Sequence, residues 1–417
     1  MRALIYGNGI SGKGAHKLLG EKGIDSAYVD DNSSIDVLDG ADMLVLSPSI
    51  TLDKPLVREA EKRNIEVIGE IELGYRYAKG NIVAVTGTNG KTTTCMMLGA
   101  IMREAGKEHF VLGNIGKSFA SSVSKTTDNS TTILEVSSFQ LESIEDFRPH
   151  IAVMLNIGID HIERHGSFEE YIKVKSDIFS NMQGNDIVVL NYDDSVVQSM
   201  ASAVKADIRY FSMTNRVDGA YVFEKWIYYR DERLCAVKDL HLIGSHNVMN
   251  ALAAITVAKS MGINNIHIIR ALRTFSLPPH RIQFVGRYRK KNYYNDSKAT
   301  NIEATISAVR SIRGSIALII GGYDKGISYN ELFKSLDKNV RSVIIFGQNK
   351  GKIEADIKNY DIRYYVEPTL LKAIERASRE RVENVLFSPG TSSYDMFKNY
   401  EERGDMFVKL TLDINEE

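Results

Sequence analysis

A short glycine-containing loop constrains this chain more than any other feature. Residues 87–92 read Gly-Thr-Asn-Gly-Lys-Thr, between the strand-like run Val83–Thr86 and the helix-like stretch Thr93–Ala105. Backbone N–H groups that converge at the N-terminus of a helix bind anions. A lysine followed by a hydroxyl residue at the end of such a loop is typical of nucleotide-binding sites. We therefore predict that Lys91 contacts the outer phosphates of ATP and that Thr92 ligates magnesium.

One position departs from the general pattern of phosphate loops. That pattern has a glycine where this chain has Val85, six residues before Lys91. A chance glycine-rich turn is the alternative interpretation. The strand before the loop and the helix after it favour nucleotide binding.

Short runs rich in Val and Ile recur along the chain and alternate with amphipathic, helix-like stretches. Such runs are typical of strands that are buried on both faces of a parallel sheet, so the pattern predicts an α/β fold. The runs are Ala3–Tyr6, Met43–Leu46, Ile82–Val85, Ile133–Val136, Ile151–Leu155, Ile187–Leu190, Ile316–Ile320, Val343–Phe346 and Val385–Phe387.

The alternation restarts twice, which predicts three domains. Each is expected to have a mostly parallel sheet with flanking helices, and the central one carries the phosphate loop. The boundaries are 1–79, 80–276 and 277–417, and Ser276–Pro279 is expected to be a linker because consecutive prolines cannot continue a helix.

The composition excludes several classes of protein. With 43% hydrophobic and 25% charged residues and a net charge of −1, no overall field favours nucleic acid or an anionic membrane. Cys95 and Cys235 lack the spacing of a zinc site, which is consistent with a reducing compartment. No signal peptide or membrane-spanning run is recognisable, so we expect a cytoplasmic protein.

The amino-terminal segment contains a second glycine motif. Gly7–Gly12 has the form GxGxxG directly after a strand, and Asp30 and Asp31 follow. This pattern is compatible with a bound nucleotide diphosphate, a dinucleotide cofactor or a structural tight turn. Too few residues precede the next strand for a full dinucleotide fold, which favours the diphosphate.

Three residues beyond the phosphate loop are candidates for a metal site. Glu135 ends a predicted strand, where a carboxylate is well placed to hold magnesium. His161 follows another strand and is either a ligand or a surface histidine. Lys175 shares a helix face with Tyr171, and an exposed lysine is the alternative.

Together with the phosphate loop, further segments make the chain resemble the Mur ligases, the ATP-dependent amino-acid ligases of peptidoglycan synthesis. The resemblance covers nearly the whole chain in the same order and is least specific over the first 80 residues. The segments that carry it are Gly113–Gly116, Glu135–Leu141, Asn156, Asp160–His161, Tyr171 with Lys175, Gly244–Asn250 and Pro279–Arg281.

Within that family, three segments indicate the member that adds D-glutamate to UDP-N-acetylmuramoyl-L-alanine. They are Asn295–Asn301, Gly321–Gly326 and Ser388–Gly404. The resemblance implies a Rossmann-like UDP-substrate-binding domain, a central P-loop ATPase domain and a Rossmann-like carboxy-terminal domain for the incoming amino acid. It also implies an acyl-phosphate intermediate and the release of ADP and phosphate.

The resemblance assigns roles to individual residues. ATP contacts are expected at Gly87, Thr88, Asn89, Gly90, Lys91, Thr92, Thr93, Asn247, Asn250, Arg281 and Asp296. Two magnesium ions are expected at Thr92, Glu135, His161 and Lys175, the last as a carbamate. The UDP-linked substrate is expected at Gly9, Ile10, Ser11, Gly12, Asp30, Asn114 and His161, and D-glutamate at Thr300, Lys325, Ser393, Tyr394 and Tyr400. Catalytic roles are expected for Lys91, His161 and Lys175.

Two positions depart from the family pattern. The segment Ser47-Pro48-Ser49 stands where the family usually has Ser-Pro-Gly, so Ser49 replaces a glycine. Tyr394 stands where the family often has leucine. The alternatives to this assignment are another Mur-type ligase, a folate polyglutamylating ligase, a nucleotide-binding regulatory protein and a nicotinamide oxidoreductase. A monomer that binds only small molecules is expected.

Overall fold

The computed structural model describes residues 1–240, 244–276 and 279–416, and the chain divides into two compact units. One unit comprises residues 1–241 and 248–275, and the other comprises 242–247 and 276–417. The division into three domains stays a prediction. The expected linker Ser276–Pro279 falls on a segment of which residues 277 and 278 lie outside the described residues.

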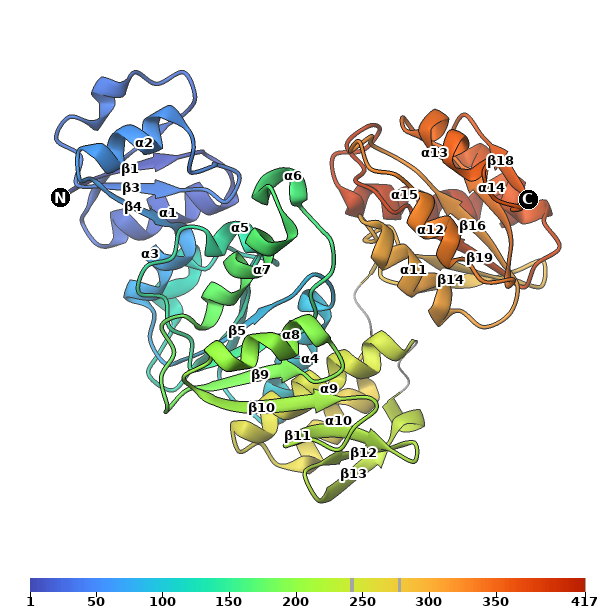
Figure 1. Cartoon of the computed structure of the whole chain (residues 1–417), viewed down its shortest axis with the longest axis horizontal. Coiled ribbons are helices and arrows are strands. Elements are labelled where there is room, and N and C mark those ends of the chain that lie inside the picture. The colour runs from blue at the N-terminus through green and yellow to red at the C-terminus, as the bar shows by residue number, and fades with distance from the viewer. Residues whose placement is uncertain (241–243, 277–278, 417) are drawn as a thin grey trace. The chain divides into compact units, whose positions relative to one another are not determined.

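The amino-terminal sheet of the first unit has four parallel strands in the order β2-β1-β3-β4. Helices α1 and α2 flank this sheet (Figure 1). Successive side chains of β1 point to opposite faces, so Leu4 and Tyr6 cluster with residues of α2 while Ala3 and Ile5 cluster with residues of α1. The elements are β1 (Arg2–Tyr6), α1 (Ile10–Glu21), β2 (Asp25–Val29), β3 (Met43–Leu46), α2 (Pro55–Lys62), β4 (Glu66–Gly69) and α3 (Glu70–Tyr77).

The second sheet of this unit has nine strands in the order β13-β12-β11-β10-β9-β8-β5-β7-β6. Its strands are β5 (Asn81–Thr86), β6 (His109–Gly113), β7 (Thr131–Glu135), β8 (Ile151–Met154), β9 (Ile187–Asn191), β10 (Asp207–Ser212), β11 (Gly219–Phe223), β12 (Trp226–Tyr229) and β13 (Glu232–Ala236). Its helices are α4 (Lys91–Glu104), α5 (Ser138–Leu141), α6 (Ile162–His165), α7 (Phe168–Ser176), α8 (Ser195–Met200), α9 (Ser245–Ser260) and α10 (Asn265–Thr274).

The two sheets of the first unit share one hydrophobic core, which runs from Ala3 to Met200. Buried carboxylates reinforce the contact: Glu70 accepts a hydrogen bond of 2.6 Å from the Ala120 N–H. Glu72 accepts from the backbone N–H groups of residues 145, 146 and 147 at 2.9–3.1 Å. These bonds fix α3 against the loops of the larger sheet.

The second unit contains a six-stranded sheet in the order β14-β15-β19-β16-β17-β18. The helices α11 to α13 cover one face and α14 with α15 covers the other, so both faces are buried (Figure 1). The strands are β14 (Gln283–Tyr288), β15 (Lys291–Asn295), β16 (Ile316–Ile320), β17 (Val340–Ile345), β18 (Tyr364–Val366) and β19 (Asn384–Phe387). The helices are α11 (Ile302–Ser311), α12 (Asn330–Ser335), α13 (Lys350–Ile357), α14 (Leu370–Arg379) and α15 (Tyr400–Glu416).

The structure confirms the predicted α/β fold with three mostly parallel sheets and flanking helices. The helix expected from Thr93 begins two residues earlier, at Lys91, because the phosphate loop turns directly into the helix. Several strands, among them β11, β12 and β13, correspond to no run named from the sequence, and β12 pairs antiparallel with both β11 and β13.

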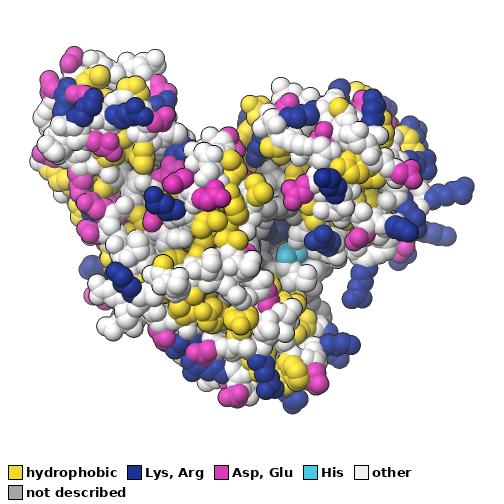
Figure 2. Space-filling view, viewed as in Figure 1, with side chains coloured by type: hydrophobic (Ala, Val, Ile, Leu, Met, Phe, Trp, Pro, Cys, Tyr) yellow, Lys and Arg dark blue, Asp and Glu magenta, His cyan; other side chains and the backbone are white. Residues whose placement is uncertain are grey.

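The surface carries no dominant charge. On the face that Figure 2 shows, acidic and basic side chains are interspersed, in agreement with the net charge of −1. Among the described residues, no helix is both long and apolar enough to cross a membrane.

Candidate active site

The phosphate loop connects the carboxyl end of β5 to the N-terminus of α4. Two of its glycines have positive φ, +146° at Gly87 and +90° at Gly90, which non-glycine residues rarely adopt. A Cβ at Gly90 would lie 2.3 Å from Oδ1 of Asn250 on α9, and a Cβ at Gly87 would lie 2.9 Å from the Cβ of Leu155. The loop therefore needs glycine for both conformation and space.

The segment after β8 holds this loop in place. The Asn89 N–H donates to Oδ1 of Asn156 at 2.8 Å, and Nδ2 of Asn156 donates back to the Asn89 carbonyl at 3.0 Å. The Thr88 hydroxyl lies 3.0 Å from the Tyr171 hydroxyl and accepts from the Gly158 N–H at 2.9 Å. These contacts shape the loop before any nucleotide is bound.

The position of Val85 explains why this chain lacks the first glycine of the general phosphate-loop pattern. It is a fully buried residue of β5, paired in register with Glu135 on β7 and Val153 on β8. The turn begins only at Gly87, so position 85 needs a strand residue rather than a glycine.

Lys91 and Lys175 meet at the phosphate loop. Nζ of Lys91 donates to the carbonyls of Gly87 at 2.8 Å and Thr88 at 2.9 Å. Nζ of Lys175 donates to the same Gly87 carbonyl at 3.1 Å and to Oγ1 of Thr86 at 3.3 Å. Lys175 is 1% exposed, which rules out the interpretation of an exposed lysine. Burial, together with the charge of Lys91, holds the pKa of Lys175 well below its usual value.

Glu135 and Asn114 form a second part of the site, at the ends of β7 and β6. Nδ2 of Asn114 donates to Oε1 of Glu135 at 3.1 Å, and the Asn114 N–H donates to the Glu135 carbonyl at 2.9 Å. Oε2 of Glu135 is buried and has no hydrogen-bond partner among the described residues. A residue predicted for the UDP-linked substrate thus supports one predicted for magnesium.

His161 lies in a strained turn at the start of α6. Its φ is +54°, and its ring packs against the Phe139 ring with centroids 4.7 Å apart. Asp160 and Glu163 each lie 3.6 Å from a ring nitrogen. About a third of the side chain is exposed, so a ligand can reach the imidazole.

Magnesium is implied by the resemblance, and the donor set fits it in part. Mg²⁺ is usually bound by one or two carboxylates together with substrate phosphates rather than by a cage of protein groups. The partnerless Oε2 of Glu135 and the buried Thr92 suit that arrangement. Within the described ranges, no three His, Cys, Asp or Glu side chains form a preformed metal site.

The Gly7–Gly12 turn lies where α1 begins. A Cβ at Gly12 would lie 1.9 Å from the Gly7 carbonyl oxygen, so only glycine fits there. The neighbouring Asp30 is exposed and accepts from the Asn32 N–H at 2.9 Å. Its neighbour Asp31 pairs with Lys54 at 2.7 Å, which lowers the pKa of Asp31 below its usual range. Gly9, Ile10 and Ser11 line the same turn.

In the second unit, Asp296 follows β15 and is buried. Its carboxylate accepts from the Ile282 N–H at 3.1 Å and from the Ser388 hydroxyl at 2.8 Å. Burial raises the pKa of Asp296 to about 7, against the opposing charge of Arg281. Arg281 and Asp296, both predicted for ATP, therefore lie near each other. Asn247 is fully buried at the start of α9.

The residues predicted for D-glutamate lie at the carboxyl ends of the strands of this unit. Nζ of Lys325 donates to the Thr300 carbonyl at 3.2 Å. Ser393 is buried, and the Tyr400 carbonyl accepts from the Ser297 hydroxyl at 2.9 Å.

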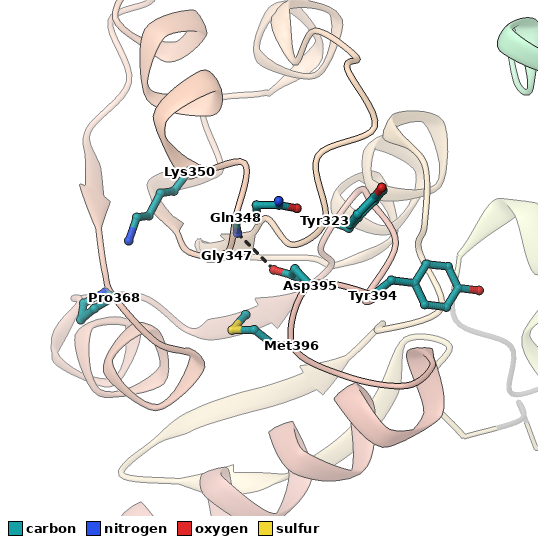
Figure 3. A pocket seen from close by; sticks show the side chains of 8 residues that line it. All are labelled: Tyr323, Gly347, Gln348, Lys350, Pro368, Tyr394, Asp395 and Met396. Carbon is teal, nitrogen blue, oxygen red and sulfur yellow. Dashed lines mark hydrogen bonds between the residues drawn. The ribbon is translucent and has the colours of Figure 1, made fainter.

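Tyr394 differs from the adjacent Ser393 in being exposed. It is 69% exposed and lines a pocket of about 490 Å³ with Tyr323, whose ring lies edge-on at 6.4 Å (Figure 3). The other lining residues are Gly347, Gln348, Lys350, Pro368, Asp395 and Met396. The remaining four predicted D-glutamate residues, all within the described chain, do not line it.

Sequence reasoning overlooked two arginines. Arg403 is fully buried and donates to Ser297 at 2.8–3.0 Å and to the Ser392 carbonyl at 3.0 Å, so it ties together two loops of the second unit. Arg164 does the same for two loops of the first unit. The signal in the sequence was weak: Arg403 lies inside the segment Ser388–Gly404, and Arg164 lies three residues after His161.

Comparison with known proteins gives two matches to family models. The model described as "Mur ligase middle domain" matches residues 85–258, and "Mur ligase, glutamate ligase domain" matches residues 280–388. A UDP-N-acetylmuramoylalanine--D-glutamate ligase of Caldanaerobacter subterraneus subsp. tengcongensis is 41% identical over 383 residues, 90% of this chain and 85% of that protein. One of Lachnoclostridium phytofermentans is 36% identical over 448 residues, with 100% and 99% coverage.

Solved structures share the fold at low identity. A pseudomurein peptide ligase type C from Methanothermus fervidus superposes with a TM-score of 0.65 at 18% identity over 99% of both chains. The MurF ligase of Thermotoga maritima in complex with ADP gives 0.64 at 19% identity over 91% of both chains.

Proposed function

Because the chain belongs to the Mur ligase family, we propose that it adds D-glutamate to UDP-N-acetylmuramoyl-L-alanine in a reaction driven by ATP. The main support is that relatives 36–41% identical over most of the chain are named UDP-N-acetylmuramoylalanine--D-glutamate ligase. Family membership argues against a nicotinamide oxidoreductase. The reaction is an acid–amino-acid ligation of peptidoglycan synthesis.

The chemistry proceeds in two steps. The γ-phosphoryl group of ATP passes to the L-alanine carboxylate, which gives an acyl phosphate and ADP. The amine of D-glutamate then attacks the acyl carbon, loses a proton and displaces inorganic phosphate. Protein groups contribute mainly positioning and electrostatic stabilisation in such transfers.

Lys91 is proposed to release the Gly87 and Thr88 carbonyls and to contact the transferred phosphoryl group. Its positive charge then offsets the negative charge that develops on the outer phosphates. The amides of residues 87–92 and the N-terminus of α4 bind the remaining phosphate oxygens. When bound, magnesium would supply further charge neutralisation, held by Thr92 and Glu135.

Lys175 is proposed to carry a carbamate. Formation requires a neutral amine, which attacks carbon dioxide and loses one proton. Burial and the charge of Lys91 lower the pKa of Lys175, which favours the neutral amine that this reaction requires. The product is an anion, which together with Glu135 and His161 would bind a second magnesium ion.

Substrate assignment follows the predicted regions. We propose that residues 1–79 bind the UDP part, with the Gly9–Gly12 turn and Asp30 contributing, and that Asn114 and His161 reach the muramoyl part. D-glutamate is assigned to Thr300, Lys325, Ser393 and Tyr400. Tyr394 is assigned to D-glutamate with them, and its side chain lines the pocket that also contains Tyr323.

The deciding experiment measures phosphate release with ATP, magnesium and UDP-N-acetylmuramoyl-L-alanine while the amino acid is varied. D-glutamate should stimulate release, and L-glutamate, diaminopimelate and L-alanine should not. Turnover with one of those three but not with D-glutamate would instead favour another Mur-type or folate polyglutamylating ligase. A cytoplasmic location, where ATP is available, and a monomeric state belong to the same proposal.

A further inference from the structure

The loop after β3 shapes the Gly7–Gly12 turn. The Ser47 N–H donates to the Tyr6 carbonyl at 3.0 Å, and the Ser47 hydroxyl donates to the Gly7 carbonyl at 3.3 Å. A Cβ at Gly7, whose φ is +98°, would lie 2.9 Å from Oγ of Ser47 and 3.9 Å from Cγ1 of Ile50. Any displacement of this loop therefore changes the shape of the glycine turn.

A single guanidinium from another part of the unit holds this loop. Nη2 of Arg164 donates to the Ile50 carbonyl at 2.9 Å and to the Pro48 carbonyl at 3.4 Å, and Nη1 donates to the Ser49 carbonyl at 3.3 Å. Three successive carbonyls thus converge on one side chain that lies more than a hundred residues away in the sequence. Ser49 is not among the described residues with positive φ, so serine is accommodated where the family usually has glycine.

Arg164 is itself held in place by Glu142 and Phe139. Its guanidinium donates to both carboxylate oxygens of Glu142, the shortest bond being 2.5 Å, and lies 4.8 Å from the centroid of the Phe139 ring. Both side chains of this ion pair are only 12% exposed. Nδ1 of His165 lies 3.3 Å from Glu142 on the other side.

The same aromatic ring supports His161. Phe139 packs against the His161 ring, and the Arg164 N–H donates to the His161 carbonyl at 3.0 Å. One cluster, formed by Phe139, Glu142 and Arg164, therefore supports both the His161 turn and the 48–50 loop. The cluster therefore connects the loop beside the Gly7–Gly12 turn with the His161 turn.

We propose that Arg164 is a positioning residue for the UDP-linked substrate. By holding the carbonyls of residues 48–50 against Glu142, it sets the shape of the Gly7–Gly12 turn and its alignment with the His161 turn. An arginine suits this role because its planar fork offers several donors at fixed angles, which a lysine lacks. The inference rests on the proposed function.

The test compares Arg164→Ala and Arg164→Lys with the unaltered enzyme. We expect the dissociation constant for UDP, measured by calorimetry without ATP, and the KM for UDP-N-acetylmuramoyl-L-alanine to rise about tenfold or more in Arg164→Ala. Arg164→Lys should restore only part of the loss, and the dissociation constant for ATP should stay within about twofold. Glu142→Gln should move the UDP affinity in the same direction, which keeps the proposal testable if Arg164→Ala does not fold.

Arg148→Ala serves as the matched control. Arg148 pairs with Asp186 at 2.7 Å in the same unit and is partly buried, with 34% of its side chain exposed, but it does not contact the 48–50 loop. It should lower thermal stability without changing UDP affinity. Unchanged UDP affinity in Arg164→Ala, or an equal loss of UDP and ATP affinity there, would overturn the proposal.

The two proposals fail differently. If D-glutamate does not stimulate phosphate release by the unaltered enzyme, the proposed function is wrong. If the unaltered enzyme binds UDP and Arg164→Ala binds it equally well, the positioning role is wrong whichever amino acid is used.

Discussion

The side-chain nitrogens of Lys91 and Lys175 share one acceptor, the carbonyl oxygen of Gly87, at 2.8 and 3.1 Å. Two ammonium groups that share one acceptor repel each other, and Lys175, which is 1% exposed, is removed from the bulk water that would stabilise its charge. The structure therefore favours the neutral amine of Lys175 over its cation. A neutral amine beside a phosphate loop is chemically ready for modification by carbon dioxide.

Lys175→Ala is expected to lower ligation by about a thousandfold or more, because the carbamate that completes the metal site cannot form. The fold should persist, since the change removes a buried amine from α7 and alanine is a good helix former. Phosphate release measures activity and circular dichroism measures folding. Lys173→Ala, on the same helix but with an exposed side chain paired to Glu170, should be nearly fully active. Near-normal turnover of Lys175→Ala would refute the carbamate.

Gly90→Ala is expected to abolish ATP binding. The added Cβ would lie 2.3 Å from Oδ1 of Asn250, and φ is +90°. Gly106→Ala is the control, because φ is +64° there but nothing lies within 4 Å of the added Cβ. It should reduce stability by about 1 kcal/mol and leave ATP affinity unchanged. Equal ATP affinity in the two variants would contradict the importance of the close contact.

Asn114→Asp is expected to reduce kcat more than Asn114→Ala. The aspartate would place a second carboxylate about 3 Å from Oε1 of Glu135, where the amide now donates a hydrogen bond. In Asn114→Ala the hydrogen bond to Glu135 is lost, but no second negative charge is added, so the Glu135 carboxylate only becomes free to rotate. Initial rates over a range of magnesium concentrations separate the two effects. If both variants show the same kcat and the same magnesium dependence as the unaltered enzyme, Asn114 does not support Glu135.

Glu70 is expected to make stability depend on pH. Burial raises the pKa of Glu70 to about 7, whereas the unfolded value is about 4.3. Between these values the folded state binds more protons, so this contribution to stability is present below about pH 4 and is lost as pH rises through about 7. Its full size is about 4 kcal/mol at most.

Thermal unfolding at pH 5.5 and pH 8 tests this expectation. Glu70→Gln should reduce the drop in Tm between the two values. Asp296, whose pKa burial also raises to about 7, should retain part of the dependence. A Tm difference unchanged by Glu70→Gln would show that Glu70 titrates at its ordinary pKa.

Much of the fold followed from local pattern. Runs such as Ile316–Ile320 and Met43–Leu46 are observed as strands with the same bounds, because continuous Val, Ile and Leu suit only a sheet covered on both faces. The strands β11 to β13 were not anticipated, because residues 219–236 mix aromatic, charged and turn residues without a clean alternation. Likewise, no local pattern predicts that Arg164 donates hydrogen bonds to the carbonyls of residues 48–50.

By itself, the sequence determined the fold class, the phosphate loop and the resemblance to one family, because each depends on residues that are close together in the chain. Only the tertiary structure decided that Lys175 is buried beside Lys91, that Asn114 bonds to Glu135 and that Tyr394 lines a pocket with Tyr323. Proton affinity, hydrogen-bond pairing and side-chain direction depend on neighbours that arrive from distant segments. Strand and loop patterns carry no information about those neighbours until the sheets are assembled.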